Sequence, residues 1–262
     1  MIIPEFSPSR RLIYIFDLLF ELVARDMKLR YKRSVLGIAW SLLNPLFQLL
    51  VLLFIFNMVV PVNIPNYFSF LFTGLLSWIW FQSSLLLATG AIVENRDLIK
   101  KPGLPAAILP TVTVTSSLIH FLIAIPILLI FLKLDGIRLT SASLALPIVI
   151  AIQFILTLSL AFLLATLQVF FRDTLYLLGV FLNLLFFLIP IFYDASKVPE
   201  RFKTLYNLNP MVHIIEAYRT ILIRGELPDN LSLLLVGLLA TGLLIFSYKI
   251  FKRASYYFAE EL

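Results

Sequence analysis

Long apolar runs separated by short charged segments dominate this sequence. Six runs are uncharged or nearly so, at residues 35–60, 67–92, 106–132, 144–170, 175–193 and 231–250. A helix needs about 20 apolar residues to cross the hydrocarbon core of a bilayer, because each residue adds 1.5 Å. The pattern therefore predicts an all-α membrane protein with six transmembrane helices. The first four runs exceed that length, so we expect their helices to tilt, bend or extend beyond the lipid.

The segment before the first run has charged and apolar positions that both recur at helical spacing. Within 12–33, one face carries Asp17, Glu21, Arg25, Lys28 and Lys32, and a roughly opposite face carries Phe16, Phe20, Val23 and Met27. Such an amphipathic helix lies in the membrane interface; the alternative is a solvated helix packed on a soluble core. The chain thus divides into 1–33, a cytoplasmic lead-in with an interfacial helix, and 34–262, the transmembrane domain. We expect an interfacial gate formed by the basic residues Arg25, Lys28, Arg30, Lys32 and Arg33.

Composition and charge support a membrane location. Hydrophobic residues make up 61% of the 262 residues and the mean hydropathy is +0.99, whereas soluble domains are about 45–50% apolar. The net charge of +6 would suggest nucleic acid in a soluble protein, but here Lys and Arg cluster beside the spans as orientation signals. Of the 21 Lys and Arg, 14 fall in segments on the side of the N-terminus and 7 on the other side. We therefore expect a multi-pass protein of the plasma (inner) membrane with both termini cytoplasmic and no nucleic-acid partner.

A charged connection, 194–230, lies between the last two spans on the outer side. It holds two short helical patterns, 201–208 and 211–224, which predict a re-entrant helical hairpin, because a structureless loop of this length is uncommon. The alternative is a plain extracytoplasmic loop. Its candidate functional residues are Asn209, Pro210, Glu216 and Arg219. Glu216 and Arg219 have the i, i+3 spacing of a helical ion pair.

A second charged connection, 94–105, lies on the inner side. Its mixed charges and closing prolines suit a short cytoplasmic helix that docks a partner protein, although a turn that only orients the spans would look similar. The candidate coupling residues are Glu94, Arg96, Asp97, Lys100 and Lys101.

Features required by several classes of enzyme and carrier are absent from the sequence. There is no G-x-x-x-x-G-K-[ST] phosphate-binding motif, no carboxylate pair within the spans and no nucleophile with an evident base. The lack of cysteine and the separation of His120 from His213 argue against a metal site. We expect a transport subunit that is not an enzyme and binds no cofactor, so the energy for uphill movement enters from another subunit. The polar strip around His120 is expected to form hydrogen bonds between helices; contact with a substrate is the alternative.

Aromatic side chains recur within the spans beside amides. Trp40, Phe47 and Phe54 follow one another at i, i+7 and i+14, with Asn44 and Gln48 near their stripe. Aromatic faces stack on sugar rings and amides hydrogen-bond sugar hydroxyls, so a channel lined in this way suits a glycan. The candidate lining residues are Trp40, Asn44, Phe47, Phe54, Trp78, Phe81, Phe187 and Tyr193. The alternative for all of them is packing, lipid contact or an interfacial belt.

Several of these motifs also carry a family resemblance. Residues 25–45 read R-D-M-K-L-R-Y-K-R-S-V-L-G-I-A-W-S-L-L-N-P, residues 170–174 read F-F-R-D-T and residues 190–193 read P-I-F-Y. With the Asp97–Lys101 segment, Pro105 and Pro110, and with Asn209-Pro210, Glu216, Tyr218, Arg219 and Gly225, the chain resembles permease subunits of ABC-2-type polysaccharide exporters. The match extends over nearly the whole chain.

The resemblance implies a homodimeric channel with two cytoplasmic ABC ATPase subunits, which bind ATP and Mg. It implies export of a lipid-linked polysaccharide, such as O-antigen, capsule or teichoic acid, from the cytoplasm across the plasma membrane. In that scheme the interfacial helix gates or couples and the outer hairpin closes the far end of the channel. Two alternatives stay open: an ABC-2 permease for a small lipid or drug, and a non-conducting membrane scaffold.

Overall fold

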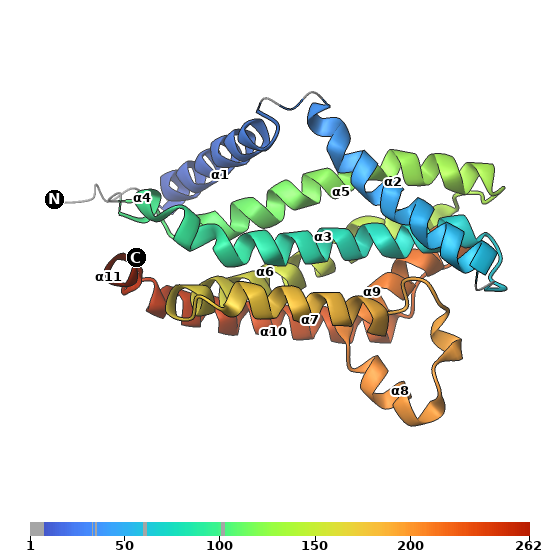
Figure 1. Ribbon diagram of the computed structural model, residues 1–262. Coiled ribbons are helices and arrows are strands. Elements are labelled where there is room, and N and C mark those ends of the chain that lie inside the picture. The colour runs from blue at the N-terminus through green and yellow to red at the C-terminus, as the bar shows by residue number, and fades with distance from the viewer. Residues whose placement is uncertain (1–7, 33, 35, 60–61, 101–102) are drawn as a thin grey trace.

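Helix α3 (Tyr67–Glu94) runs through the centre of the molecule, and the other long helices surround it (Figure 1). The computed structural model describes residues 8–32, 34, 36–59, 62–100 and 103–262, and every regular element among them is helical. The other long helices are α1 (Pro8–Arg30), α2 (Trp40–Leu53), α5 (Ile108–Leu134), α6 (Leu146–Phe170), α7 (Thr174–Leu188) and α10 (Asn230–Ala254). The shorter elements are η1 (Gly37–Ala39), η2 (Phe54–Val59), α4 (Arg96–Ile99), η3 (Ser141–Ala145), η4 (Ala195–Lys197), α8 (Glu200–Asn207), α9 (Pro210–Arg219), η5 (Thr220–Arg224) and α11 (Phe258–Glu261).

The sequence of α3 explains its central position. Small side chains are frequent along it and lie buried, so neighbouring helices approach closely, as in other membrane bundles. Helices α5 and α6 pack along α3, and α10 packs along α6. A reciprocal amide contact joins α3 to α6: the Ser77 hydroxyl donates to Gln153 Oε1 at 3.1 Å, and Gln153 Nε2 donates to the Ser77 carbonyl at 2.9 Å. Of the most apolar stretch of α3, 72% is buried, against 11% for 37–59 and 17% for α10.

The predicted all-α membrane class is confirmed, because five helices of the described residues are long and apolar enough to cross a membrane. They are 37–59, α3, α5, the 141–170 helix and α10, which match five of the six predicted runs. The start of α1 and the C-terminal helix α11 lie at the same end of the bundle as α4 (Figure 1). The short helices α8 and α9 lie toward the opposite end.

The predicted fifth span, 175–193, is wrong at its C-terminal end. Helix α7 stops at Leu188 after 15 residues, which span about 22 Å, and Ile189 is extended, with φ −94° and ψ 148°. Pro190 accounts for the break, since a proline disfavours helical geometry in the residue before it. The following Ile191 is fully buried, so hydropathy alone could not separate this turn from the helix.

Helix α1 packs on α5 (Figure 1). Val23 is buried and Met27 packs against the same cluster, whereas Phe16 and Phe20 are largely exposed. The single apolar face predicted for this helix is therefore divided between the bundle and the surroundings. The exposed side chains of Phe16 and Phe20 suit insertion into a membrane interface.

The two short helices predicted in 194–230 are confirmed, but they differ in their packing. Helix α9 is buried against α3, α6 and α10, whereas α8 projects away from the bundle and contacts α9 (Figure 1). Asn209 caps α9, because its side-chain oxygen accepts from the Met211 N–H at 3.0 Å, and Pro210 occupies the first helical position. The Asn-Pro pair thus separates α8 from α9.

Candidate functional sites

The charged connection between α3 and α5 forms an exposed surface at the end of α3. Glu94, Arg96, Asp97 and Lys100 are all exposed, and the predicted short helix is present as α4. Lys101 lies outside the described residues. The C-terminal helix α11 also contacts α4, so the end of the chain borders the same surface.

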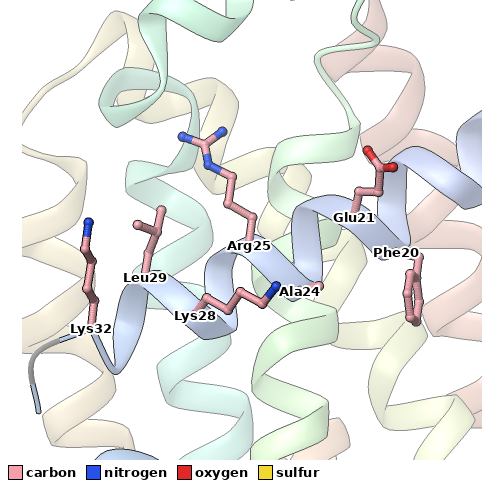
Figure 2. Close-up of a pocket in the computed structure, with 7 residues that line it drawn as sticks. All are labelled: Phe20, Glu21, Ala24, Arg25, Lys28, Leu29 and Lys32. Carbon is pink, nitrogen blue, oxygen red and sulfur yellow. The ribbon is translucent and has the colours of Figure 1, made fainter.

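Arg25 of α1 borders this surface, because it lines a cleft together with Asn95 and Leu98. Figure 2 shows Glu21, Arg25, Leu29 and Lys32 on one side of α1 and Phe20 on the other, around a hollow of about 610 Å³. Arg30 pairs with Asp26 one turn earlier, at 3.0 Å. A small cleft of about 80 Å³ separates α1 from α4 and α5, with Arg25, Asp26 and Asn95 among its lining residues. The predicted gate residue Lys28 is exposed, and Arg33 lies outside the described residues.

The end of α1 is tied to the middle of α5. The Tyr31 hydroxyl shares a hydrogen bond with Nδ1 of His120 at 3.1 Å, and the two rings meet edge to face at 5.7 Å. Burial raises the pKa of Tyr31 above its usual value of 10.0. The prediction of a hydrogen bond from His120 to another segment is confirmed. The neighbouring Thr111 and Thr115 instead donate to carbonyls of their own helix, both at 2.8 Å.

The predicted aromatic stripe lies on a free face of the 37–59 helix. Trp40, Phe47 and Phe54 are 48%, 56% and 58% exposed. Asn44 and Gln48 share this face and approach each other at 3.4 Å, between Gln48 Nε2 and Asn44 Oδ1. The face therefore presents amides and aromatic rings together at membrane depth.

Helix α7 also contacts α3 and has a free face of its own. Both α2 and α7 contact α3, and the rings of Phe56 and Phe192 stack at 4.9 Å between their two segments. Phe187 and Asn183 are exposed on α7. The Tyr193 hydroxyl donates to the Leu188 carbonyl at 2.9 Å, which holds the turn after α7.

Two candidate lining residues are placed elsewhere. Trp78 is 1% exposed and Phe81 is 4% exposed, because α3 is enclosed by its neighbours. Trp78 donates to Gln82 Oε1 at 3.0 Å and packs near Phe186. These two side chains belong to the helix core and present no surface to a solute in this structure.

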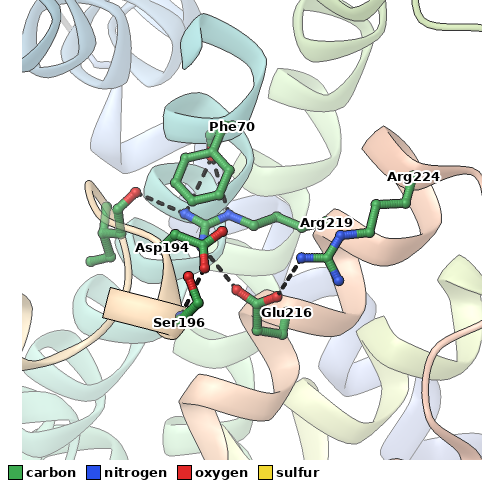
Figure 3. Close-up of polar contacts among 7 residues, drawn as sticks. Phe70, Asp194, Ser196, Glu216, Arg219 and Arg224 are labelled. Atoms are coloured by element: carbon green, nitrogen blue, oxygen red, sulfur yellow. Dashed lines mark hydrogen bonds and ion pairs between the residues drawn. The ribbon is translucent and has the colours of Figure 1, made fainter. Parts of the chain in front are cut away.

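Arg219 forms the most buried charged contact among the described residues (Figure 3). Its side chain is 1% exposed and pairs with Glu216 at 3.2 Å, as the spacing predicted. Its Nη2 donates to the Ile191 carbonyl at 2.8 Å and Nε donates to the Phe70 carbonyl at 3.3 Å. The guanidinium also lies 3.4 Å from the centroid of the Phe70 ring. Arg219 therefore ties α9 to α3 and to the turn after α7.

The surroundings of Arg219 keep it charged. Burial lowers its pKa from 12.5 to about 10, against the opposing charge of Glu216. Glu216 also receives Arg224 at 3.4 Å, so one carboxylate serves two cations (Figure 3). Burial tends to raise the pKa of Asp194, but hydrogen bonds from Ser196 and the positive charges of Arg224 and Arg219 bring it below 3.8.

The sequence did not predict that the Arg219 side chain is buried. Its acceptors lie 28 and 149 residues away in the chain, so no local pattern points to them. Gly74 contributes by having no side chain, because a Cβ at that position would lie 2.8 Å from Nη2 of Arg219. A glycine within a long apolar helix was the one available signal of a close approach.

Comparison with known proteins gives a consistent set of relatives. Residues 17–223 match the family model described as ABC-2 type transporter. The chain is 36% identical over 252 residues to the O-antigen export system permease protein RfbA of Klebsiella pneumoniae, covering 95% of this chain and 96% of that protein. It is 36% identical over 255 residues to RfbA of Myxococcus xanthus, covering 97% of this chain and 98% of that protein. It is 25% identical over 215 residues to the polysialic acid transport protein KpsM of Escherichia coli, covering 81% and 83%.

Proposed function

Because the chain belongs to the ABC-2 type transporter family, we propose that it is the permease subunit of an ABC exporter that carries a polysaccharide across the plasma membrane. Polymers of the O-antigen and capsule classes are the cargo named for its relatives. The polymer is lipid-linked and moves outward from the cytoplasm. ATP hydrolysis takes place in a separate subunit, and this chain contributes the path.

The exposed amides of α2 support this proposal most directly. Asn44 and Gln48 lie on a free face at membrane depth, and amide groups in contact with hydrocarbon are costly. The free face of α10 differs, since Leu235, Leu238 and Phe246 are typical of it. The α10 face therefore suits lipid, and the α2 face suits a partner copy and an aqueous path.

A homodimer follows from the same argument. One copy leaves the apolar and amide side chains of α2 and α7 uncovered, and a second copy related by a two-fold axis would cover part of this surface. Phe187 and the Trp40–Phe47–Phe54 stripe then border the path. Aromatic rings and amides suit a glycan that must slide without being held tightly.

The arrangement in the membrane completes the proposal. We place six spans across the bilayer, with the 15-residue helix α7 as the shortest, and both termini in the cytoplasm. This orientation puts α1, α4 and α11 on the inner side, where two copies of an ABC ATPase dock. It puts α8 and α9 at the outer end.

The test replaces the two amides of α2 by leucine, Asn44→Leu with Gln48→Leu, in cells that depend on this chain for surface polysaccharide. We expect export to fall about tenfold, since the loss of two hydrogen bonds of about 0.5–1.5 kcal/mol each gives a change of that order. Leu235→Ala on α10 is the control and should leave export unchanged. Size-exclusion chromatography checks that the permease–ATPase complex still assembles. Normal export in the double leucine variant would place this face against lipid and remove the main support for the path.

A further inference from the structure

A pocket of about 790 Å³ opens between the end of α7, the turn that follows it and α8. Aromatic rings form much of its wall, from Phe187, Tyr193, Phe202 and Tyr206. Two of these residues also border the face of α7 proposed to line the path. The other two come from α8, an element that the proposed path does not use.

Polar groups converge on the same pocket. Lys197 stands at its wall, and Asn209 lies beside it at the end of α8. The side-chain oxygen of Asn209 is engaged in capping α9, whereas its NH₂ group makes no hydrogen bond to the described residues. The Tyr206 hydroxyl is buried near that of Tyr193, so Tyr206 offers the pocket its ring. An amide and an ammonium group therefore lie among the aromatic and aliphatic side chains of the pocket.

This combination suits sugar rings better than a lipid chain. An acyl or prenyl chain would leave the Asn209 amide without a partner, at a cost in free energy. A sugar ring offers C–H groups to the electron-rich aromatic faces and hydroxyls to the polar groups. Pockets that are mostly apolar, with a few convergent polar groups, are the usual form of small-ligand sites.

We propose that the α7–α8 pocket binds sugar units of the exported polymer at the outer end of the path. The inference rests on the proposed export function and adds α8 to it as a glycan-contacting element. Lys197 allows acidic as well as neutral sugars, because an ammonium attracts a carboxylate and also donates to hydroxyls. The rings of Phe202 and Tyr206 contact the sugar. The exposed rim of α8, which includes Leu205, stays accessible to solvent.

Site-specific photo-cross-linking in exporting cells tests the occupant of the pocket. Phe202 is replaced by the photoreactive residue p-benzoylphenylalanine, and Leu235 on α10 is replaced in the same way as a control. We expect light to attach the cell's own polysaccharide to the permease from position 202 and not from 235, detected with an antibody to that polymer. The adduct should require active ATPase. Cross-links from 202 only to phospholipid, only to a second copy of the chain, or to nothing would overturn the inference.

Surface polysaccharide is measured in the same cells, so the two proposals can fail separately. Export without a glycan adduct at 202 refutes the pocket alone, whereas a chain that supports no export refutes the proposed function. A second pair of variants tests stacking: Phe202→Leu keeps apolar bulk without a ring, and Phe202→Trp keeps a ring. We expect a two- to tenfold lower export rate for Phe202→Leu, about the value of one aromatic contact, and a normal rate for Phe202→Trp. Equal rates for both would show that the ring does not matter.

Discussion

Because Gly74 and Arg219 are in close contact, the effect of Gly74→Ala on stability should change sign when Arg219 is removed. A glycine-to-alanine change in a helix normally stabilises by about 1 kcal/mol. At Gly74, however, the new Cβ would lie 2.8 Å from Arg219 Nη2, which is held by the Ile191 carbonyl and the Phe70 ring. Overpacking of this kind costs about 1–3 kcal/mol. We therefore expect Gly74→Ala to destabilise the wild-type chain by about 1 kcal/mol.

Removal of the arginine should reverse this effect. Arg219→Ala alone loses charge-assisted hydrogen bonds and leaves the Ile191 carbonyl without its donor, which costs about 3 kcal/mol. Glu216 retains Arg224, so its charge is not left unpaired. In the Arg219→Ala background, Gly74→Ala meets no guanidinium and should stabilise by about 1 kcal/mol. The double-mutant cycle then gives a coupling of about 2 kcal/mol, typical of residues in contact.

Equilibrium unfolding in mixed detergent micelles provides the measurement. Trp78 and Trp80 lie in the core of α3 and report its unfolding by fluorescence. Gly242→Ala on α10 is the matched control, because nothing lies within 4 Å of a Cβ there, and it should stabilise equally in both backgrounds. If Gly74→Ala stabilised the wild type as much as Gly242→Ala does, the proposed close contact of Arg219 would be refuted.

Three further predictions concern the surface at α4, the anchor of α1 and the charged network around Arg219. Reversal of Arg96 and Lys100 to glutamate should weaken co-purification of the ATPase about tenfold, as expected for charges at an interface; unchanged association would exclude α4 as its docking site. Tyr31→Phe should cost about 1 kcal/mol and speed hydrogen exchange in α1, with no added effect in an His120→Leu background; additive effects would contradict a shared bond. Because the folded-state pKa of Asp194 is depressed, its stabilisation is present above its usual pKa of 3.8 and is lost as the pH falls through the lower folded value. The melting temperature of Asp194→Asn should therefore lie below that of the wild type at pH 7 and approach it in acid, whereas a constant difference would contradict this role.

The helices that are long and apolar were predictable because their signal is local. Hydropathy located the five long apolar helices. Helical patterns located α8 and α9, and mixed charges with closing prolines indicated α4. The end of α7 was not predictable in this way, since the buried turn around Ile191 is as apolar as the helix before it. Which side of an apolar helix is covered depends on neighbours distant in the chain, and for that reason the sequence did not show that Trp78 is buried.

For Arg219, the sequence predicted the local ion pair but not the burial of the side chain. Its partner Glu216 lies three residues away, and helical spacing predicted that pair. Its burial depends on Phe70, Ile191 and the missing side chain of Gly74, which only the assembled bundle brings together. A charge that looked suited to an exposed helix edge is instead part of the packing between α3, α7 and α9.

Helices α9 and α8 differ in packing, so substitutions in them should separate effects on stability from effects on transport. Helix α9 is fixed by buried side chains and by Arg219, so substitutions there should lower stability and export together. Helix α8 is joined to it by a hydrogen bond between His213 Nε2 and the Asn207 carbonyl at 2.7 Å, and its own side chains are largely uncovered. Substitutions of Phe202 or Leu205 therefore remove little packing. A loss of export at unchanged stability in these variants would therefore support the proposed contact between α8 and the polymer.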